Sequence, residues 1–204
     1  SVPPSAAVDA RLPSPITHSA SGPSSVADSA GSLSPDTAPS SAASKFWARR
    51  FTLFNRFARG VLLDDEGWYS VTPECLAAHQ AFRLGCQMVV DAMCGCGGNT
   101  VALARTCGQV LALDTNAERV AMAQHNAAVY GVGARTQFLV GDCVSLLPQL
   151  RADCVFMSPP WGGPLYSRTA YYRLDEMQPP LWRLLQAAFA VSSEVALFLP
   201  RTVQ

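Results

Sequence analysis

The feature that most constrains the fold is a regular alternation of short apolar runs with helical patterns in the second half of the chain. Five runs have the length and composition of buried strands: residues 87–93, 109–114, 136–142, 152–158 and 194–200. Helical patterns follow the glycine-rich turn at 95–98 and cover 117–131 and 181–190. Apolar strands joined by helices predict a parallel sheet covered on both faces. We therefore expect an α/β, Rossmann-like, doubly wound fold.

The first part of the chain divides into two regions of contrasting composition. Residues 1–44 are dominated by Ser, Ala and Pro and contain no aromatic residue, which predicts a disordered tail. Residues 45–84 predict a small helical extension, and residues 85–204 the sheet domain. Thr72 followed by Pro73 has the pattern of a helix N-cap and first helical position, so we expect a helix from there to about residue 84.

The stretch from residue 45 to residue 60, KFWARRFTLFNRFARG, interleaves aromatic and basic residues. No acidic residue occurs between Asp36 and Asp64. One interpretation is an amphipathic helix laid on the core with its basic face in solvent. The other is a basic-aromatic surface for a phosphate-bearing ligand. The two interpretations are compatible, and both stay open.

Charge and cysteine content exclude several classes of protein. The 15 basic residues balance 15 acidic ones, so any nucleic-acid contact must come from local clusters of charge. The 7 cysteines are scattered, without a CxxC pair or a histidine at ligand spacing, so we expect reduced thiols and no metal site. No apolar run approaches the roughly 18 residues of a membrane span, and a signal peptide is not expected.

The first candidate binding motif is DAMCGCGGNT at residues 91–100, after the first expected strand. Ligands of such sheets bind beyond the carboxyl ends of the strands, where glycines let the backbone approach them closely. Thr100 stands where a dinucleotide fingerprint needs its third glycine, and Asp91 would repel a pyrophosphate. A carboxylate there can attract the ammonium group of S-adenosylmethionine, directly or through water. We predict cofactor contacts at Asp91, Gly95, Gly97, Asn99 and Thr100. The alternative is a tight turn without a ligand.

Two further carboxylates close neighbouring strands. Asp114 ends the second strand, 23 residues after Asp91. A carboxylate at that place accepts hydrogen bonds from both ribose hydroxyls of an adenosine cofactor. Asp142 ends the third strand, where it is a candidate contact to the adenine amine. Together with the glycine-rich turn, these positions predict an adenosine-containing cofactor.

The third candidate motif is SPPWGG at residues 158–163, after the fourth strand. Two prolines fix the backbone and remove two amide donors, so carbonyl acceptors face the site. Such acceptors suit an exocyclic amine, and the indole of Trp161 offers a flat face for stacking a base. Polar-Pro-Pro-aromatic tetrapeptides at this place mark amino-directed methyltransferases, although the polar residue here is Ser158 rather than Asp or Asn. The alternative is a proline-rich loop with a buried tryptophan.

Together with further segments, these motifs resemble the trimethylguanosine synthase family, the RNA cap guanine-N2 methyltransferases. The resemblance runs from Lys45 to about Arg201. It rests on the segments KFWARRFTLFNRF, DDEGWYSVTPE, DAMCGCGGNT, HNAAVYG, GDC, SPPWGGP and FLPR. It implies a class I methyltransferase that transfers a methyl group from S-adenosylmethionine to the exocyclic N2 of a 7-methylguanosine RNA cap.

The resemblance also implies roles for individual residues. Trp161 would stack on the 7-methylguanine, with Ser158 and Pro159 beside its amine. Lys45 and Arg201 would hold the cap phosphates. We name no general base, because the cationic ring of 7-methylguanine already makes its amine proton more acidic. Ser158 would act at most as an acceptor.

The same resemblance places Phe54 and Thr72 in segments that fold over the cofactor. Met93 stands where the family usually has an aromatic residue. The sequence stops just past the fifth expected strand, whereas the fold normally continues with an antiparallel pair, so we expect a sheet without those C-terminal strands. The implied partners are capped RNAs of the snRNA, snoRNA or spliced-leader type. The implied location is the nucleus, including the nucleolus, with the cytoplasm as a further location.

Two other functions stay open. The first is methylation of an internal guanine or adenine amine in RNA or DNA, through the same proline-containing loop. The second is a degenerate methyltransferase fold that serves as an RNA- or protein-binding module. Cofactor binding and competition by a free 7-methylguanosine cap analogue separate the three hypotheses.

Overall fold

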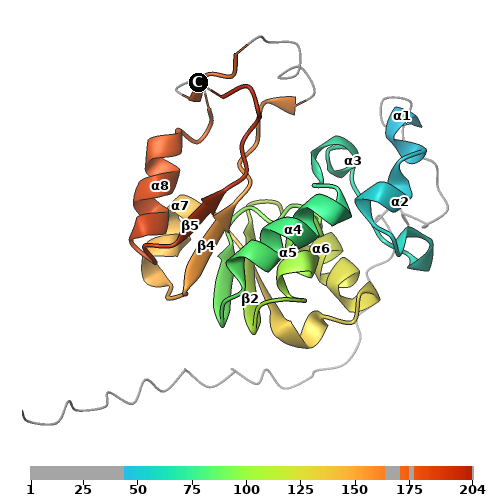
Figure 1. Ribbon diagram of the computed structural model, residues 1–204, viewed down its shortest axis with the longest axis horizontal. Helices are drawn as coiled ribbons and strands as arrows, with labels where there is room; N and C mark the ends of the chain where they lie inside the picture. The colour runs from blue at the N-terminus through green and yellow to red at the C-terminus, as the bar shows by residue number, and fades with distance from the viewer. Residues whose placement is uncertain (1–43, 164–170, 175–176, 204) are drawn as a thin grey trace, which may run out of the picture. The chain divides into compact units, whose positions relative to one another are not determined.

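Five parallel strands form one sheet in the computed structural model, which describes residues 44–163, 171–174 and 177–203 (Figure 1). The strands are β1 (Met88–Asp91), β2 (Gln109–Asp114), β3 (Thr136–Val140), β4 (Cys154–Met157) and β5 (Val195–Leu197). Their order is β3-β2-β1-β4-β5, and each neighbouring pair is parallel. The predicted parallel sheet is confirmed. The chain passes from one side of β1 to the other between β3 and β4, which makes the carboxyl ends of β1 and β4 the switch point where such sheets bind ligands.

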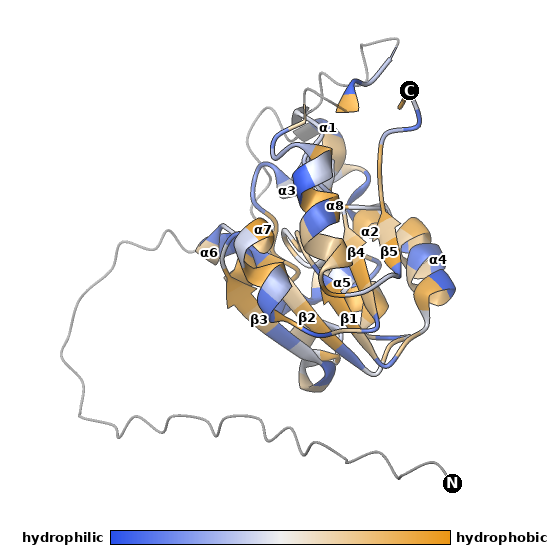
Figure 2. Ribbon diagram, turned by 90° about the vertical axis from the view of Figure 1, so that its left-hand side faces the viewer, coloured by the Kyte–Doolittle hydropathy of each residue, from blue (hydrophilic) through white to orange (hydrophobic). Residues whose placement is uncertain are grey.

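Helices cover both faces of this sheet. They are α4 (Glu74–Leu84), α5 (Gly98–Leu103), α6 (Ala117–Val129), α7 (Cys143–Leu146) and α8 (Leu181–Phe189). Val89 and Val110 pack in one buried cluster with residues of α4, α5 and α6, whereas Val90 and Leu111 pack in another with residues of α7 and α8. Adjacent strand residues point to opposite faces, and β1, β2, β4 and β5 contribute to both clusters. Figure 2 shows the hydrophobic colour along the strands and both colours on α4.

The N-terminal extension is built from short turns rather than from one amphipathic helix. Its elements are α1 (Ser44–Trp47), α2 (Arg50–Leu53), the 3-10 turn η1 (Phe57–Arg59) and α3 (Gly67–Ser70). The backbone N–H groups of Asn55 and Arg56 donate to side-chain oxygens of Glu74 and Tyr130, at 2.6 and 3.2 Å. The interpretation of this segment as one amphipathic helix does not hold, because these tertiary acceptors replace the helical hydrogen bonds after α2.

Aromatic residues of the extension form its core. The rings of Trp47, Phe57 and Trp68 lie with their centroids 5.4–5.6 Å apart. Phe54 is 1% exposed and packs against the ring of Tyr130, 5.9 Å away. The aromatic residues of segment 45–60 therefore hold α1, η1 and α3 together. The basic residues of the same segment face outward or contact carbonyl groups.

Helix α4 ends at Leu84 with Gly85 as its C-cap, as predicted. Its start differs by one residue, because Pro73 is the N-cap and makes no side-chain cap hydrogen bond. The predicted N-cap, Thr72, is instead 4% exposed and faces the cavity described below. The N-cap assignment of Thr72 is therefore wrong, since its side chain belongs to the cavity wall and not to the helix terminus.

Hydrogen bonds and ion pairs fix the extension against α6. The buried side chain of Asn126 donates to the carbonyl of Leu62 and accepts from its N–H, both at 2.8 Å. Nε of Arg119 lies 2.7 Å from a carboxylate oxygen of Asp64, and its Nη2 pairs with Glu66. The extension thus becomes part of the ligand-binding edge of the sheet.

At the other end of the chain, Tyr172 and Val203 form a single parallel bridge beyond β5. No antiparallel strand pair follows β5 in the part of the chain that the structure describes. The segment expected to be a disordered tail lies outside the described residues, apart from Ser44, which begins α1. None of the described helices has the length and apolar character needed to cross a membrane.

Candidate functional site

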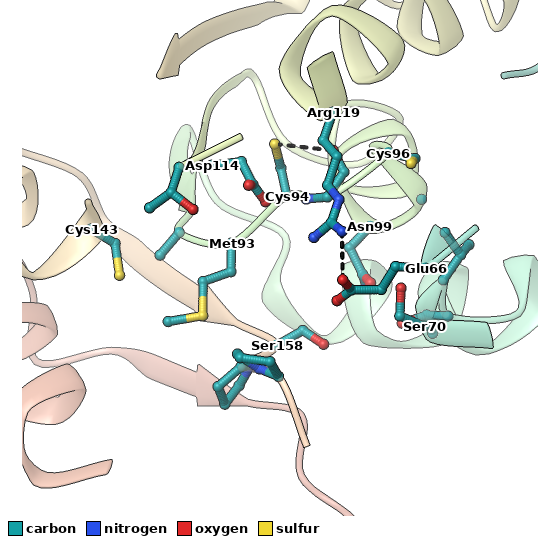
Figure 3. A pocket seen from close by; sticks show the side chains of 18 of the residues that line it. Glu66, Ser70, Met93, Cys94, Cys96, Asn99, Asp114, Arg119, Cys143 and Ser158 are labelled. Carbon is teal, nitrogen blue, oxygen red and sulfur yellow. Dashed lines mark hydrogen bonds and ion pairs between the residues drawn. The ribbon is translucent and has the colours of Figure 1, made fainter. Parts of the chain in front are cut away.

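The carboxyl ends of β1, β2 and β4 border a cavity of about 250 Å³, which we call the main cavity (Figure 3). One wall comes from the turns that follow these strands and from the start of α7. The opposite wall comes from residues 66–72 of the N-terminal extension. The predicted site residues that line the main cavity are Thr72, Gly95, Asn99, Asp114, Asp142, Ser158, Pro159 and Trp161.

Two glycines of the turn after β1 have positive φ, 50° at Gly95 and 86° at Gly97. A Cβ built on Gly95 meets no atom within 4 Å, so this residue borders open space in the main cavity. A Cβ built on Gly97 would lie 3.0 Å from Ala123 of α6. Gly97 is therefore required by helix packing and does not line the main cavity, and its predicted contact with the cofactor stays a prediction.

Asp91, the last residue of β1, is 0% exposed, and its Oδ2 accepts a hydrogen bond from the hydroxyl of Thr100 at 2.6 Å. Its Oδ1 is buried without a hydrogen-bond partner among the described residues. Burial raises the pKa of Asp91 to about 7, helped by the charge of Asp114 and opposed by the hydrogen bond from Thr100. Asp91 and Thr100 do not line the main cavity, and their predicted contacts with the cofactor, direct or through water for Asp91, stay predictions.

Asp114 lines the main cavity at the end of β2, where two backbone groups hold its carboxylate. Oδ2 accepts from the N–H of Gly95 at 2.8 Å, and Oδ1 accepts from the N–H of Asn116 at 2.9 Å. A carboxylate offers about four acceptor sites, so both oxygens keep capacity for a further donor. The arrangement suits a diol placed beside Gly95.

Asp142 serves as the N-cap of α7. Its Oδ1 accepts from the N–H of Val144 at 3.2 Å, and its Oδ2 accepts from the N–H and hydroxyl of Ser145, at 3.3 and 2.8 Å. The carboxylate lines the main cavity but is exposed. Cys143, which is buried beside it, adds an apolar surface to the same wall.

The loop after β4 brings Ser158, Pro159 and Trp161 to the wall that faces the extension. The indole N–H of Trp161 donates to the carbonyl of Phe198 at 3.2 Å. The two rings meet edge-on, with centroids 5.0 Å apart and planes at 62°. Trp161 is half-buried and lies in the cavity wall, so the alternative of a tryptophan inside the core does not hold.

A second cavity of about 210 Å³ lies next to the main cavity. Trp161 and residues 69–72 line both. The second cavity adds Phe46 and Arg49 of the extension and Phe198 after β5. Trp161 therefore stands between a cavity at the strand ends and a more aromatic one beneath the extension.

Comparison with known proteins places this geometry in a family. A family model described as RNA cap guanine-N2 methyltransferase matches residues 86–204. Trimethylguanosine synthase of Schizosaccharomyces pombe is 39% identical over 168 residues, which cover 77% of this chain and 70% of the relative. The chain belongs to the RNA cap guanine-N2 methyltransferase family. Trimethylguanosine synthase of Saccharomyces cerevisiae is 35% identical over 170 residues, and the match spans 54% of its length.

Solved structures support the fold assignment. A candidate methyltransferase from Porphyromonas gingivalis W83 matches with a TM-score of 0.61 at 18% identity, covering 79% of this chain and 41% of that one. An S-adenosylmethionine-dependent O-methyltransferase from Thermotoga maritima matches with a TM-score of 0.51 at 18% identity, covering 65% and 46%. Together with the five-stranded parallel sheet, these matches confirm the Rossmann-like, class I methyltransferase fold.

Three residues to which the resemblance gave roles do not line either cavity. Lys45 is exposed, and its Nζ lies 4.9 Å from the centroid of the Phe46 ring. Arg201 is exposed and follows β5. Phe54 is buried, and its ring approaches a Cβ built on Gly98 to 3.8 Å. The predicted place of Phe54 in a segment that folds over the cofactor stays a prediction. The phosphate roles of Lys45 and Arg201 stay predictions.

Sequence reasoning missed several residues of this cap methyltransferase site. Glu66, Tyr69 and Ser70 line the main cavity from the extension, and Arg119 lines it from α6. Figure 3 shows Glu66 and Arg119 pointing toward one another at the cavity. The segment DDEGWYS contributed to the family resemblance, yet its acidic residues received no role. A lone arginine in the first turn of α6 gave no signal, because its acidic partners are more than 50 residues away in sequence.

The described residues contain no group of three or more His, Cys, Asp or Glu placed to hold a metal ion. All seven cysteines are free thiols, and five of them are buried. Burial, together with the charge of Asp64, raises the pKa of Cys96 to about 12, so this thiol at the cavity wall stays protonated at neutral pH. The buried cysteines are explained by their packing as small apolar side chains.

Proposed function

We propose that this chain transfers a methyl group from S-adenosylmethionine to the exocyclic N2 of 7-methylguanosine at the 5′ end of capped RNA, forming a di- or trimethylguanosine cap. The observation that carries the proposal is the place of Trp161 between the two cavities. A purine on this indole lies next to the strand ends that line the main cavity, within reach of a cofactor there.

The main cavity fits S-adenosylmethionine on two observations. Gly95 leaves open space beside the turn, and the carboxylate of Asp114 is fixed next to it with acceptor capacity for a ribose diol. Asp142 and Cys143 would border the adenine. When bound, the cofactor supplies a methyl group attached to a positively charged sulfur.

The loop after β4 would hold the substrate base. Because its indole N–H is tied to the carbonyl of Phe198, Trp161 presents a ring of fixed orientation. A 7-methylated guanine is cationic, so stacking gains a cation–π contribution of about 0.5–2 kcal/mol, a preference of about 2- to 30-fold over plain guanine. Ser158 and the carbonyl groups beside Pro159 would accept hydrogen bonds from the amine.

Alignment would account for most of the rate enhancement. Holding two reacting groups in line contributes at most about 7–11 kcal/mol. In this family-based proposal the amine attacks as a neutral nucleophile and its proton becomes more acidic on the methylated ring. The side chains that line the described main cavity include no histidine or lysine, which fits a reaction without a strong base.

The proposed substrates are capped RNAs of the snRNA, snoRNA or spliced-leader type. The proposed location is the nucleus, including the nucleolus, with the cytoplasm as an alternative. Both parts follow from the family relationship and are tested by identifying RNAs that lose trimethylguanosine caps when the protein is depleted. Unchanged caps on all three classes of RNA would remove this part of the proposal.

A labelled methyl-transfer assay tests the proposed reaction. The full chain is incubated with labelled S-adenosylmethionine and with capped RNA, uncapped RNA or DNA, and the products are digested to nucleosides. We expect label only in N2-methylated 7-methylguanosine, and inhibition by free cap analogue. Label in uncapped RNA or DNA without such inhibition would indicate internal amine methylation. No transfer and no calorimetric cofactor binding would indicate a binding module.

A further inference from the structure

Helices α1 and α2 carry basic and aromatic side chains that line neither cavity. We call Lys45, Arg50 and Phe51 the α1–α2 surface. Lys45 is exposed, Arg50 is half-buried, and the ring of Phe51 is 48% exposed. Phe51 meets Phe57 of the extension's core edge-on, with ring centroids 6.4 Å apart, and keeps about half of its surface in solvent.

This surface has a positive charge that the described protein does not neutralise. Between residues 45 and 59 the sequence has five cations and no acid. Among the described residues, the ion pairs join Arg105 to Glu74 and Arg119 to Asp64 and Glu66, and none involves Lys45 or Arg50. A locally basic patch on a chain of zero net charge points to an anionic ligand.

The geometry of Arg50 indicates what kind of anion fits. Its guanidinium carbon lies 4.7 Å from the Trp47 ring centroid and 4.6 Å from that of Phe51. Its Nη1 also donates to the carbonyl of Trp47 at 2.9 Å. The planar cation is therefore held against two rings, with further N–H groups free to meet a phosphate. Stacked aromatic and guanidinium groups are the usual elements of single-stranded RNA sites.

Helices α1 and α2, which carry the α1–α2 surface, also border the second cavity through Phe46 and Leu53. Phe46 and Arg49 line that cavity, and they lie in sequence between or next to the residues of the surface. A chain that leaves a base bound at Trp161 through the second cavity would pass α1 and α2. Another exposed aromatic–arginine contact among the described residues joins Trp182 and Arg183 on α8, which line neither cavity. That pair has one cation, against two on the α1–α2 surface.

We propose that the α1–α2 surface binds the first transcribed nucleotides of the RNA, 3′ of the cap. This inference rests on the proposed cap methylation and specifies how its RNA substrate is held. Phe51 stacks a base, while Lys45 and Arg50 contact the phosphates. Capped RNA is then a better substrate than a cap dinucleotide, and the difference depends on these side chains.

The test compares two substrates for one variant of the full chain, Arg50→Gln with Phe51→Ala. The substrates are a 7-methylguanosine cap dinucleotide and a capped oligonucleotide of about ten nucleotides, a length within the span of single-strand sites. Wild type should show a lower KM for the oligonucleotide. The variant should raise that KM about five-fold or more while its KM and kcat for the dinucleotide stay within about two-fold. The salt dependence of oligonucleotide binding should fall by about 0.7 in log–log slope.

A matched control is Phe82→Ala with Arg83→Gln. Phe82 is 77% exposed at the C-terminal end of α4, which precedes β1 and so lies away from the carboxyl ends of the strands. This variant should keep wild-type KM values for both substrates. Thermal melting of both variants checks that the fold is retained.

Three results would overturn the inference. Wild type with equal KM for both substrates would mean that nucleotides beyond the cap are not bound. Equal losses of the variant on both substrates would mean that α1 and α2 only support the site. An oligonucleotide-specific loss for Trp182→Ala with Arg183→Gln, and not for the α1–α2 variant, would place the RNA on α8. Failure of the proposed function is distinguishable, because wild type would then not methylate the dinucleotide.

Discussion

The cofactor half of the site and the substrate half are held in different ways. On the cofactor half, Asp91 and Asp114 accept hydrogen bonds of 2.6–2.9 Å from Thr100 in the first turn of α5 and from the turns after β1 and β2. On the substrate half, the indole N–H of Trp161 donates to a carbonyl 37 residues away, and its surroundings come from the extension.

From this difference we infer which half of the site determines substrate specificity. The turn at the end of β1 is held rigid by hydrogen bonds, which suits a cofactor that the methyltransferases of this fold share. A wall assembled from distant segments can be changed without disturbing the sheet, and in the proposed function that wall would contact the substrate. Substitutions in the first half should therefore affect cofactor affinity, and substitutions in the second half should affect cap recognition.

The largest effect is expected for Asp114→Ala. The variant loses the proposed ribose acceptor and also leaves the N–H groups of Gly95 and Asn116 without their partner. Hydrogen bonds to charged groups contribute about 1.5–3 kcal/mol each, so cofactor affinity measured by calorimetry should fall about 100-fold. Asp142→Ala is the control, with a smaller loss of affinity and a loss of about 1 kcal/mol of stability at the α7 cap. Unchanged affinity for Asp114→Ala would refute the ribose assignment.

Trp161→Ala tests the other half. Base–aromatic stacking contributes about 1–3 kcal/mol per base, so kcat/KM on capped RNA should fall about ten-fold or more. Trp161→Phe keeps a stacking face and should recover much of the activity. Cofactor affinity should change little in both variants. Activity of the alanine variant within about two-fold of wild type would exclude the stacking role.

The buried carboxyl of Asp91 makes the stability of the folded protein depend on pH. Burial raises its pKa from 3.8 to about 7 in the folded protein. Between those values the unfolded chain is ionised while the native protein keeps its proton, so stability falls as pH rises, by about 1.4 kcal/mol per unit for this group. Below about pH 4 the two states are equally protonated and this contribution to stability is fully present.

Urea unfolding at pH 5 and pH 7 measures this pH dependence. Asp91→Asn removes the titrating group. From pH 5 to pH 7, the unfolding free energy of wild type should therefore fall relative to that of the variant. Other carboxyls contribute equally to both proteins and cancel. Identical pH dependence of wild type and variant would show that Asp91 is ionised throughout.

The smallest effect concerns the ion pair that links the extension to α6. The side chains of Arg119 and Glu66 are 23% and 37% exposed, so water screens their attraction. A double-mutant cycle with Arg119→Met and Glu66→Gln should give a coupling free energy of about 1 kcal/mol. Arg119→Lys should retain part of it. Additive single effects within about 0.3 kcal/mol would mean that the pair does not hold the wall.

Much of the cofactor half could be predicted from the sequence, because its signals are local. The five apolar runs, the glycines after β1 and the carboxylates at Asp114 and Asp142 lie within single strand–turn units. The full burial of Asp91 and the packing of Gly97 against α6 could not be predicted, since a residue can lie at or near the end of a strand without facing the cavity there. An alternating pattern of apolar and polar residues does not show whether a single carboxyl is buried.

The wall from the extension could not be predicted in the same way. Its path depends on contacts between residues far apart in sequence, such as Arg56 with Tyr130 and Arg119 with Asp64. The same contacts explain why the basic-aromatic segment is not one helix. Its aromatic residues were correctly expected to pack on the core, whereas the cavity beneath them appears only once the extension is folded against α6.

A crystal structure with S-adenosylhomocysteine and a 7-methylguanosine cap analogue tests the central claim most directly. The account predicts the ribose of the cofactor product at Asp114 and the purine flat on the indole of Trp161, with its exocyclic amine turned toward the sulfur. A purine bound away from Trp161, or with its amine facing away from the main cavity, would contradict it.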